Sequence, residues 1–220
     1  AASDVYKRQI PAREAAGILS QKTGVTPIQA RIAIEACNGS ITRAMVFAKS
    51  AERAEFRARI MEVLGNLPLS DERDVLEYAA ELIERAKAPL DNVRTQQSEE
   101  LAESADFLTK SALKQIELRH KRALSMATRE SLNQTTSIIR SWLRDILMIA
   151  SGTPDLVVNK DQQEVLERMA QRVVPAGIMS ALRETYKTDE VLSYNVSPET
   201  CLDVLLFSIR EVLNGSGNPH

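Results

Sequence analysis

The sequence predicts an all-α protein, a small three-helix unit followed by a larger helical bundle, on the basis of three observations. Its 220 residues include only 8 Gly and 8 Pro, and aromatic residues make up 4% of them, which is too few for the turns and strands of an all-β protein. Apolar residues recur at helical spacing in every long segment. No residue pattern recurs at a fixed period, so a helical solenoid is not expected.

The three-helix unit is expected within residues 10–66. We expect its helices over residues 10–23, 26–37 and 40–65. Pro11 and Pro27 suit the start of a helix, where the N–H that proline lacks would have no partner. Asn38 and Gly39 can take the left-handed conformation that ends a helix, and Ser40 can cap the next one. That third helix is predicted to continue without a break to Gly65.

The larger bundle is expected over residues 67–213. We expect helices over residues 70–88, 101–150, 161–174, 175–187 and 197–213. The second of these is either one very long helix or two abutting ones, because it contains neither Gly nor Pro. Residues 91–103 are polar and weakly periodic, so we expect a solvated loop or a frayed helix start there. The tail, 214–220, is expected to be disordered, and residues 1–9 are left as an unassigned extension.

Those first nine residues have two alternative origins. They are either a fragment of a preceding element or sequence left by cloning, and the absence of an initiator Met and of hydrophobic periodicity favours the second. In both cases, the chain is expected to lack an N-terminal portion of its parent protein.

Composition limits the classes of function. The 28 basic and 30 acidic residues give a net charge of -2, which excludes a polybasic nucleic-acid coat and an acidic tail. No apolar run approaches the roughly 20 residues of a membrane span, and no signal peptide is present, so we expect a cytoplasmic protein without a membrane partner. Cys37 and Cys201 lie far apart, which excludes a C-x-x-C zinc site.

The sequence offers no recognisable catalytic, cofactor-binding or metal site. His120 is expected on a helix surface, and both cysteines are expected in the core. The basic residues between Lys110 and Arg129 are interpreted as a solvated helix face, because they are spread around the helix and lack stacking aromatics. Arg144 and Asp145 point away from the apolar face of Trp142, and we expect them to form structural ion pairs.

Four motifs, taken in order, resemble a known family. GSITRAM (39–45) resembles the G-S-x-x-R-A-L turn and helix in the lid domain of the clamp-loader branch of AAA+ proteins. LKQIELRHKR (113–122), WLRDIL (142–147) and YNVSP (194–198) follow at similar distances. The chain from about Ile10 to Leu213 is therefore similar to the delta prime subunits of bacterial DNA polymerase III, especially in their actinobacterial form. The motif residues expected to be structural are Gly39, Ser40, Arg43, Trp142, Arg144, Asp145 and Asn195.

The resemblance implies a truncated AAA+ lid at 10–66 and a collar domain at 67–213, without the ATPase module that precedes them in the family. It implies no catalytic residue, cofactor or metal in this chain, although the holoenzyme is a DNA-directed DNA polymerase, a nucleotidyltransferase. The implied partners are the ATP-hydrolysing subunit and delta, with primed DNA and the sliding clamp reached only through the assembled complex. The ATP-hydrolysing subunits place a nucleotide-sensing arginine where this chain has Thr42. The expected contact surfaces are the exposed faces of helices 99–129 and 198–213.

Two other classes of function remain open at this point. The first 40 or so residues from Ile10 also resemble the ubiquitin-associated three-helix fold, through Thr23-Gly24-Val25, Ala30-Arg31 and Asn38-Gly39-Ser40. This would make the chain a protein-binding module with a helical extension. Such a module predicts an exposed apolar patch on the first three helices. An enzyme with its site between the helices would need clustered carboxylates or histidines, which the sequence does not show.

Overall fold

The computed structural model describes residues 10–104, 107–194 and 196–215, and within these ranges the chain is all-α, as predicted. The helices are α1 (Ala12–Thr23), α2 (Pro27–Ala36), α3 (Ile41–Lys49), α4 (Ala51–Asn66), α5 (Glu72–Lys87), α6 (Pro89–Ser104), α7 (Lys110–Ala150), α8 (Gln163–Ala170), α9 (Pro175–Val191) and α10 (Pro198–Leu213). Three short 3-10 turns, η1 (Leu67–Leu69), η2 (Pro154–Leu156) and η3 (Lys160–Gln162), connect them.

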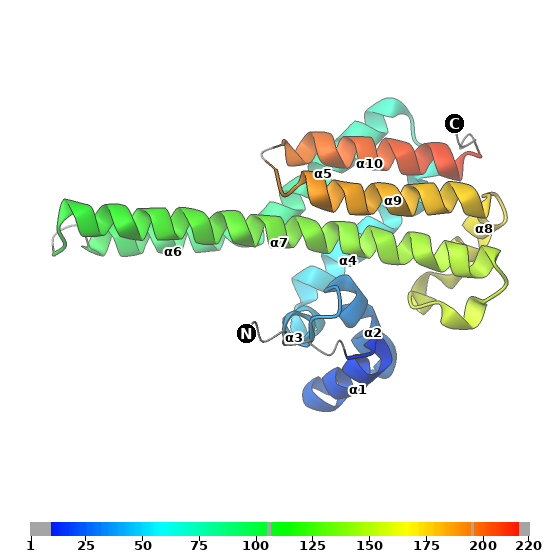
Figure 1. Cartoon of the computed structure of the whole chain (residues 1–220), viewed down its shortest axis with the longest axis horizontal. Coiled ribbons are helices and arrows are strands. Elements are labelled where there is room, and N and C mark those ends of the chain that lie inside the picture. The colour runs from blue at the N-terminus through cyan, green and yellow to red at the C-terminus, as the bar shows by residue number, and fades with distance from the viewer. Residues whose placement is uncertain (1–9, 105–106, 195, 216–220) are drawn as a thin grey trace, which may run out of the picture.

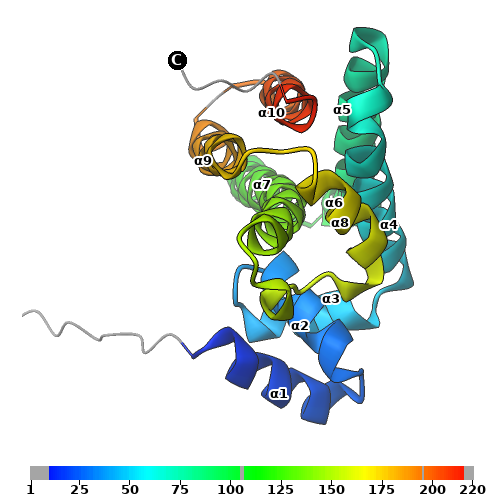
Figure 2. The ribbon, with the colours of Figure 1, turned by 90° about the vertical axis from the view of Figure 1, so that its right-hand side faces the viewer.

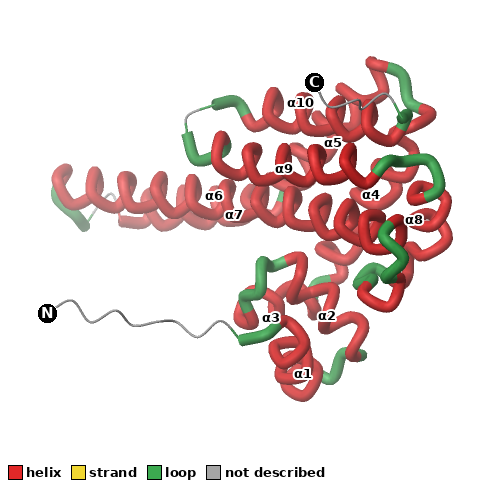
Figure 3. Tube along the Cα trace, turned by 45° about the vertical axis from the view of Figure 1, so that its right-hand side comes forward, coloured by secondary structure: helices red, strands yellow, loops and turns green. Residues whose placement is uncertain are grey.

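The 41-residue helix α7 is the axis of the fold (Figure 1). Helices α1–α3 lie on one side of its C-terminal half, and α9 and α10 lie on the other. The view along α7 in Figure 2 shows α4 and α5 covering a third side. The N-terminal half of α7 packs alongside α6, and these two helices project from the body as a hairpin (Figure 3).

The buried apolar residues form one continuous cluster from α1 to α10. Its centre is the C-terminal half of α7, where Ile139, Trp142, Leu143 and Ile146 have no exposed surface. Since both the three-helix unit and the later helices pack against this segment, it is the part of the chain that holds them in one body.

Capping residues account for several helix boundaries. Thr26 and Gln29 form a capping box at the start of α2, and Ser40 and Ser197 cap α3 and α10. The predicted continuous helix 40–65 is wrong, because Ser50 takes an extended backbone and accepts a hydrogen bond from the N–H of Arg53. This cap ends α3 and begins α4.

Other predicted boundaries also need correction. Residues 91–103 are helical within α6, since its packing against α7 supports a helix that is polar nearly all round. The expected segment 101–150 is therefore the end of α6, a turn and α7. The helix expected at 161–174 is η3 followed by α8, and the one expected at 175–187 extends to Val191 as α9. In the tail, Asn214 and Gly215 form a turn, while 216–220 lie outside the described residues, as do 1–9.

Acid is expected to destabilise this fold through carboxylates held by cations. The Lys87 ammonium and the Ser197 hydroxyl lower the pKa of Glu199 from 4.5 to about 2, and the Arg59 guanidinium lowers the pKa of Glu81. A lowered pKa in the folded state stabilises the protein at pH values above the unfolded pKa, and this contribution is lost as the pH falls through the folded pKa. We therefore expect the urea midpoint to fall between pH 4.5 and about 2.

The variant Lys87→Met tests the cause of this acid sensitivity. Without the ammonium, the pKa of Glu199 returns toward 4.5, so the ion pair no longer adds to the free energy of unfolding at neutral pH. The urea midpoint should therefore fall less steeply as the pH is lowered. Parallel curves of urea midpoint against pH for the variant and the parent protein would contradict this assignment. The matched control is Lys22→Met, since Lys22 is exposed on α1 and has no acidic partner in the described part of the chain.

Candidate functional site: the polar junction on α7

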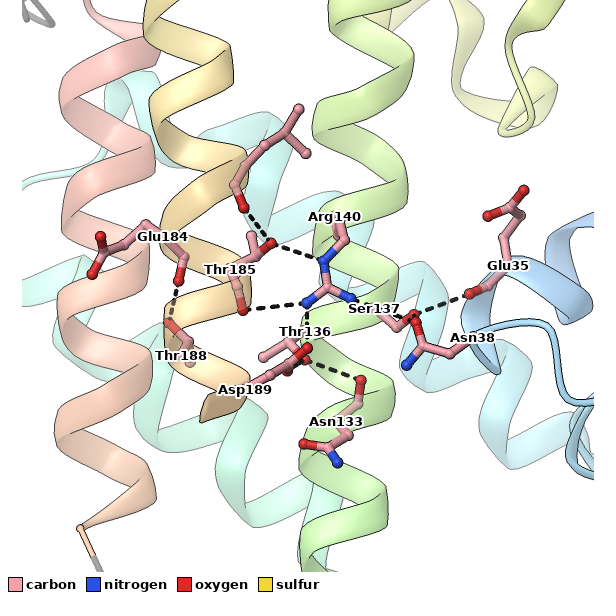
Figure 4. A network of polar contacts seen from close by, with 11 residues as sticks. Glu35, Asn38, Asn133, Thr136, Ser137, Arg140, Glu184, Thr185, Thr188 and Asp189 are labelled. Carbon is pink, nitrogen blue, oxygen red and sulfur yellow. Dashed lines mark hydrogen bonds and ion pairs between the residues drawn. The ribbon is translucent and has the colours of Figure 1, made fainter. Parts of the chain in front are cut away.

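A group of buried polar side chains lies along the middle of α7, where it meets α2 on one side and α9 on the other (Figure 4). The buried polar residues of this stretch are Gln134, Thr135, Thr136, Ser137, Ser141 and Asp145. Buried polar groups destabilise a fold unless they are hydrogen-bonded. Their partners therefore identify the contacts that hold α7 to its neighbours.

Arg140 joins α7 to α9. Its Nε donates to Thr185 Oγ1 at 2.9 Å and one Nη donates to the Thr185 carbonyl oxygen at 3.2 Å. The same guanidinium forms a short ion pair with Asp189, which also accepts a hydrogen bond from Thr136 Oγ1. The Tyr186 ring lies 4.1 Å from the guanidinium carbon, close enough for a cation–π contact. Arg140 is thus held on several sides by α9 (Figure 4).

The turn between α2 and α3 contacts the opposite side of α7. Asn38 and Gly39 both take left-handed backbone conformations, with φ of 50° and 79°. This turn brings Asn38 Oδ1 to 2.8 Å and the Glu35 carbonyl oxygen to 3.0 Å from Ser137 Oγ, so the single hydroxyl proton has two acceptors. Glu35 also pairs with Arg144 at 3.1 Å. A side chain at Gly39 would be strained in this conformation.

Asp145 anchors the segment that follows α7. It has no exposed surface, and its carboxylate accepts the N–H groups of Val158 at 3.1 Å and Asn159 at 2.7 Å. It also accepts Asn159 Nδ2 at 2.8 Å. Asn159 Oδ1 in turn accepts a hydrogen bond from Arg57 of α4 at 2.7 Å, and Arg57 pairs with Asp161 at 2.7 Å.

The charge of Asp161 follows from that pair. Its burial would raise the pKa of its carboxyl, but the Arg57 guanidinium outweighs the burial, and the pKa is lowered from 3.8. Both partners are therefore charged at neutral pH. Through them, α4, α7 and the segment between α7 and α8 form one hydrogen-bonded unit.

The structure brings most of the motif residues to this junction. Ser40 caps α3, and Arg43 pairs with Glu130 of α7 and donates to the Cys37 carbonyl oxygen at 3.2 Å. Trp142 is fully buried, and its Nε1 has no hydrogen-bond partner among the described residues. Arg144 lies 3.7 Å from Asp145 in addition to its pair with Glu35. The other motif residue, Asn195, lies outside the described residues.

Sequence reasoning does not find the residues that complete these contacts. Arg140, Arg57 and Asn159 belong to none of the motifs, although each makes more than one hydrogen bond here. The run Asn-Gln-Thr-Thr-Ser at 133–137, inside an otherwise apolar helix segment, is the available signal for a buried polar contact. No local signal marks Asn159, whose partners come from α4 and α7.

A hollow of about 380 Å³ opens beside the junction, between α2, α7 and α9. Its lining includes Glu35, Arg140, Arg144, Arg183 and Tyr186. Two of these arginines are already paired with carboxylates of the chain, and the lining contains no cysteine or histidine that could act as a nucleophile or base. The arrangement is suited to holding helices together or meeting a polar partner.

The two cysteines and His120 take no part in a reactive cluster. Cys37 and Cys201 are buried, and burial raises the pKa of the Cys37 thiol to about 11, which keeps it protonated at neutral pH. The prediction of a surface histidine is wrong. The His120 side chain is only 12% exposed, because it lies between α6 and α7 with Nε2 3.2 Å from Glu100.

The described ranges contain neither a metal-binding cluster nor a membrane span. Over residues 10–104, 107–194 and 196–215, no three His, Cys, Asp or Glu side chains are grouped to hold a metal ion. In the same part of the chain, none of the helices has an apolar stretch long enough to cross a bilayer.

Comparison with known families gives one match. The family described as DNA polymerase III, delta subunit, C terminal, matches residues 96–210, just over half of the chain. The matched range begins within α6, includes α7, α8 and α9 and ends within α10. No curated protein and no solved structure matches the sequence.

Proposed function

Since the chain belongs to the family of C-terminal domains of the DNA polymerase III delta subunit, a clamp-loader family, we propose that it is a non-catalytic portion of a loader protein that supports ring assembly of a bacterial replicative clamp loader. The observation that carries the proposal is the match over 96–210, which includes the whole of α7 and its polar junction. In this role the chain assembles with other loader subunits, which together load the sliding clamp onto primed DNA. We also propose a cytoplasmic location, where replication takes place.

The finer assignment is to the delta prime subunit, of actinobacterial type. It is supported by the Gly39-Ser40 turn followed by Arg43, and by Thr42 at the position of the nucleotide-sensing arginine of ATP-hydrolysing subunits. Arg43 itself is engaged by Glu130 and by the Cys37 carbonyl, so its guanidinium serves the contact with α7. On this assignment residues 10–66 are a truncated lid, residues 67–213 are the collar, and the partners are the ATP-hydrolysing subunit and delta.

The junction on α7 would fix the shape of such a protein. Ser137, Arg140 and Arg144 connect α7 to the α2–α3 turn or to α9, and Arg57 connects α4 to the segment after α7. Polar networks with satisfied partners hold one arrangement of helices. A lid that is fixed to its collar presents both surfaces to neighbouring subunits in a constant orientation.

The ubiquitin-associated alternative is not favoured. The family match lies in the C-terminal helices, for which that fold offers no counterpart. Within α1–α3, the exposed large apolar side chains include Ile28 and Val46, but single exposed apolar residues are normal on soluble surfaces.

Co-purification with the ATP-hydrolysing loader subunit and delta tests the proposed function. We expect a complex at micromolar concentrations, and its absence with a folded chain would contradict the proposal. Val204 of α10 is 53% exposed beside the apolar groove between α9 and α10, so Val204→Lys should weaken the complex at least about tenfold, as expected for loss of an interface contact of about 1.4 kcal/mol or more. The control Leu156→Lys alters an apolar residue with the same exposed fraction of 53%, in η2, outside the lid and outside helices 99–129 and 198–213, and should leave the complex intact.

A further inference from the structure

The hairpin of α6 and α7 carries its basic residues on exposed positions. The exposed basic residues of its second helix are Lys110, Lys114, Arg119, Lys121, Arg122 and Arg129. The structure adds to the sequence-based view that these charges are spread around the helix, because it shows which side of the helix is covered. The positions that are partly buried against α6 are occupied by other residues, among them Ile116, His120 and Leu124.

Helix geometry places the charges on the side of α7 away from α6. At 100° per residue, Lys114, Arg122 and Arg129 lie about 120–180° around the helix from His120, which contacts Glu100 of α6. The only acidic residue between Lys110 and Arg129 is Glu117, an exposed residue about 60° from His120, at the edge of the outer side and next to Lys114 and Lys121. We call the outer side, with Lys114, Arg119, Lys121, Arg122 and Arg129, the basic face of α7.

The charges of the basic face are not neutralised within the described chain. The acidic residues of the hairpin are concentrated on α6, at Glu99, Glu100 and Glu103, and Glu100 contacts His120, which is not part of the basic face. Over the described ranges, none of the five basic-face residues forms an ion pair. Five cations within four turns of helix raise the local positive potential, although the whole chain has a net charge of -2.

We propose that the basic face of α7 binds the phosphate backbone of duplex DNA. Lys114 and Arg129 are 15 residues apart, so the face extends over about 22 Å, the length of about six base pairs. The hydroxyl of Ser125 lies between the cations on an exposed position, that of Ser111 is exposed just before them, and both can donate to phosphate oxygens. The hairpin projects from the body, so a duplex can lie along it (Figure 1).

The side chains between the cations favour a duplex over a single strand. Binding of single-stranded nucleic acid uses aromatic side chains on which bases stack, and α7 has no aromatic residue between Lys110 and Arg129. Binding is therefore electrostatic and independent of base sequence. This contact does not depend on the proposed loader function, because it is argued from the charges of the hairpin alone.

The test is fluorescence anisotropy of a short labelled duplex of arbitrary sequence, titrated with the 220-residue chain. With four or five phosphate contacts, a plot of the logarithm of the binding constant against the logarithm of the salt concentration should have a slope of about -4. The triple variant Lys114→Glu, Arg122→Glu and Arg129→Glu should bind at least about tenfold more weakly at low salt. Since these positions are exposed and glutamate is a good helix former, circular dichroism should be unchanged.

A charge-matched control separates the basic face from net charge. The control triple variant carries Arg13→Glu, Lys22→Glu and Lys49→Glu, which replace three exposed cations of α1 and α3. It lowers the net charge by the same amount as the first triple variant, so duplex binding should be retained if the basic face is the binding site. Equal losses in both triple variants, or no binding by the parent chain at low salt, would overturn the proposal. Polyglutamate that competes as well as duplex at equal charge would also overturn it, in favour of an acidic protein partner. Co-purification with the loader subunits is a separate experiment, so the duplex-binding proposal and the loader proposal can each fail without the other.

Discussion

Asp145→Ala is expected to lower the free energy of unfolding by about 3–5 kcal/mol, the range for breaking a buried charged network by removing one partner. Asp145 has no exposed surface and accepts hydrogen bonds from Val158, from the N–H of Asn159 and from its side-chain amide. With alanine, these donors would stay buried without their acceptor, at a cost of about 1–3 kcal/mol for each unsatisfied group. Urea denaturation followed by circular dichroism measures the loss.

Two further variants show whether the loss comes from this carboxylate. Asp155→Ala removes an exposed acid of the same connecting segment and should change the free energy by less than about 0.5 kcal/mol. Asp145→Asn keeps one acceptor oxygen and should fall between the parent and the alanine variant. If Asp145→Ala were as stable as Asp155→Ala, the carboxylate would not be the anchor of Val158 and Asn159.

Trp142→Ala is expected to lower the free energy of unfolding by about 3–5 kcal/mol through the cavity that it leaves. The side chain is completely buried in the C-terminal half of α7, in the core that unites the N-terminal and C-terminal helices. Its Nε1 makes no hydrogen bond within the part of the chain that the structure describes, so the loss is one of packing. Trp142→Phe should therefore recover a large part of the stability, because it restores most of the apolar volume.

Circular dichroism is the appropriate measurement, since Trp142 is the single tryptophan of the chain and its replacement removes the fluorescence signal. Phe107→Ala serves as the control, because that aromatic side chain is 87% exposed near the tip of the hairpin. Its free energy of unfolding should change by less than about 0.5 kcal/mol. A Trp142→Ala protein as stable as Phe107→Ala would show that α7 does not depend on this contact.

Local sequence signals predict the helices whose ends are capped by nearby side chains. Thr26, Ser40 and Ser197 cap helices within three residues of themselves, and each lies at the predicted start of its helix or one residue away. Ser50 has the same chemistry, but the sequence pattern places it in a helix interior. A serine can stand either in a helix interior or at an N-cap, and the local sequence does not distinguish the two. Packing sets the direction of the next helix and so decides between them.

The polar segment 91–103 shows the opposite failure. Its composition indicates a solvated loop or a frayed helix start, yet it is helical in α6 because α7 supplies a packing partner. The same pairing explains His120, because its spacing from Ile116 and Leu124 places it on their face of α7 and only α6 supplies the contact that covers this face. In both cases the deciding contact comes from another helix.

The sequence by itself determined the helical class, because helical periodicity and capping act over three or four residues, and the order of its motifs carried the resemblance to the clamp-loader family. Only the tertiary structure decided that Arg57 reaches Asp161, 104 residues away, and that Arg140 reaches Asp189. It also decided that the basic residues of α7 share an outer face, since α6 had to be placed first. Contacts between distant residues depend on how helices pack, and that packing is a property of the whole core.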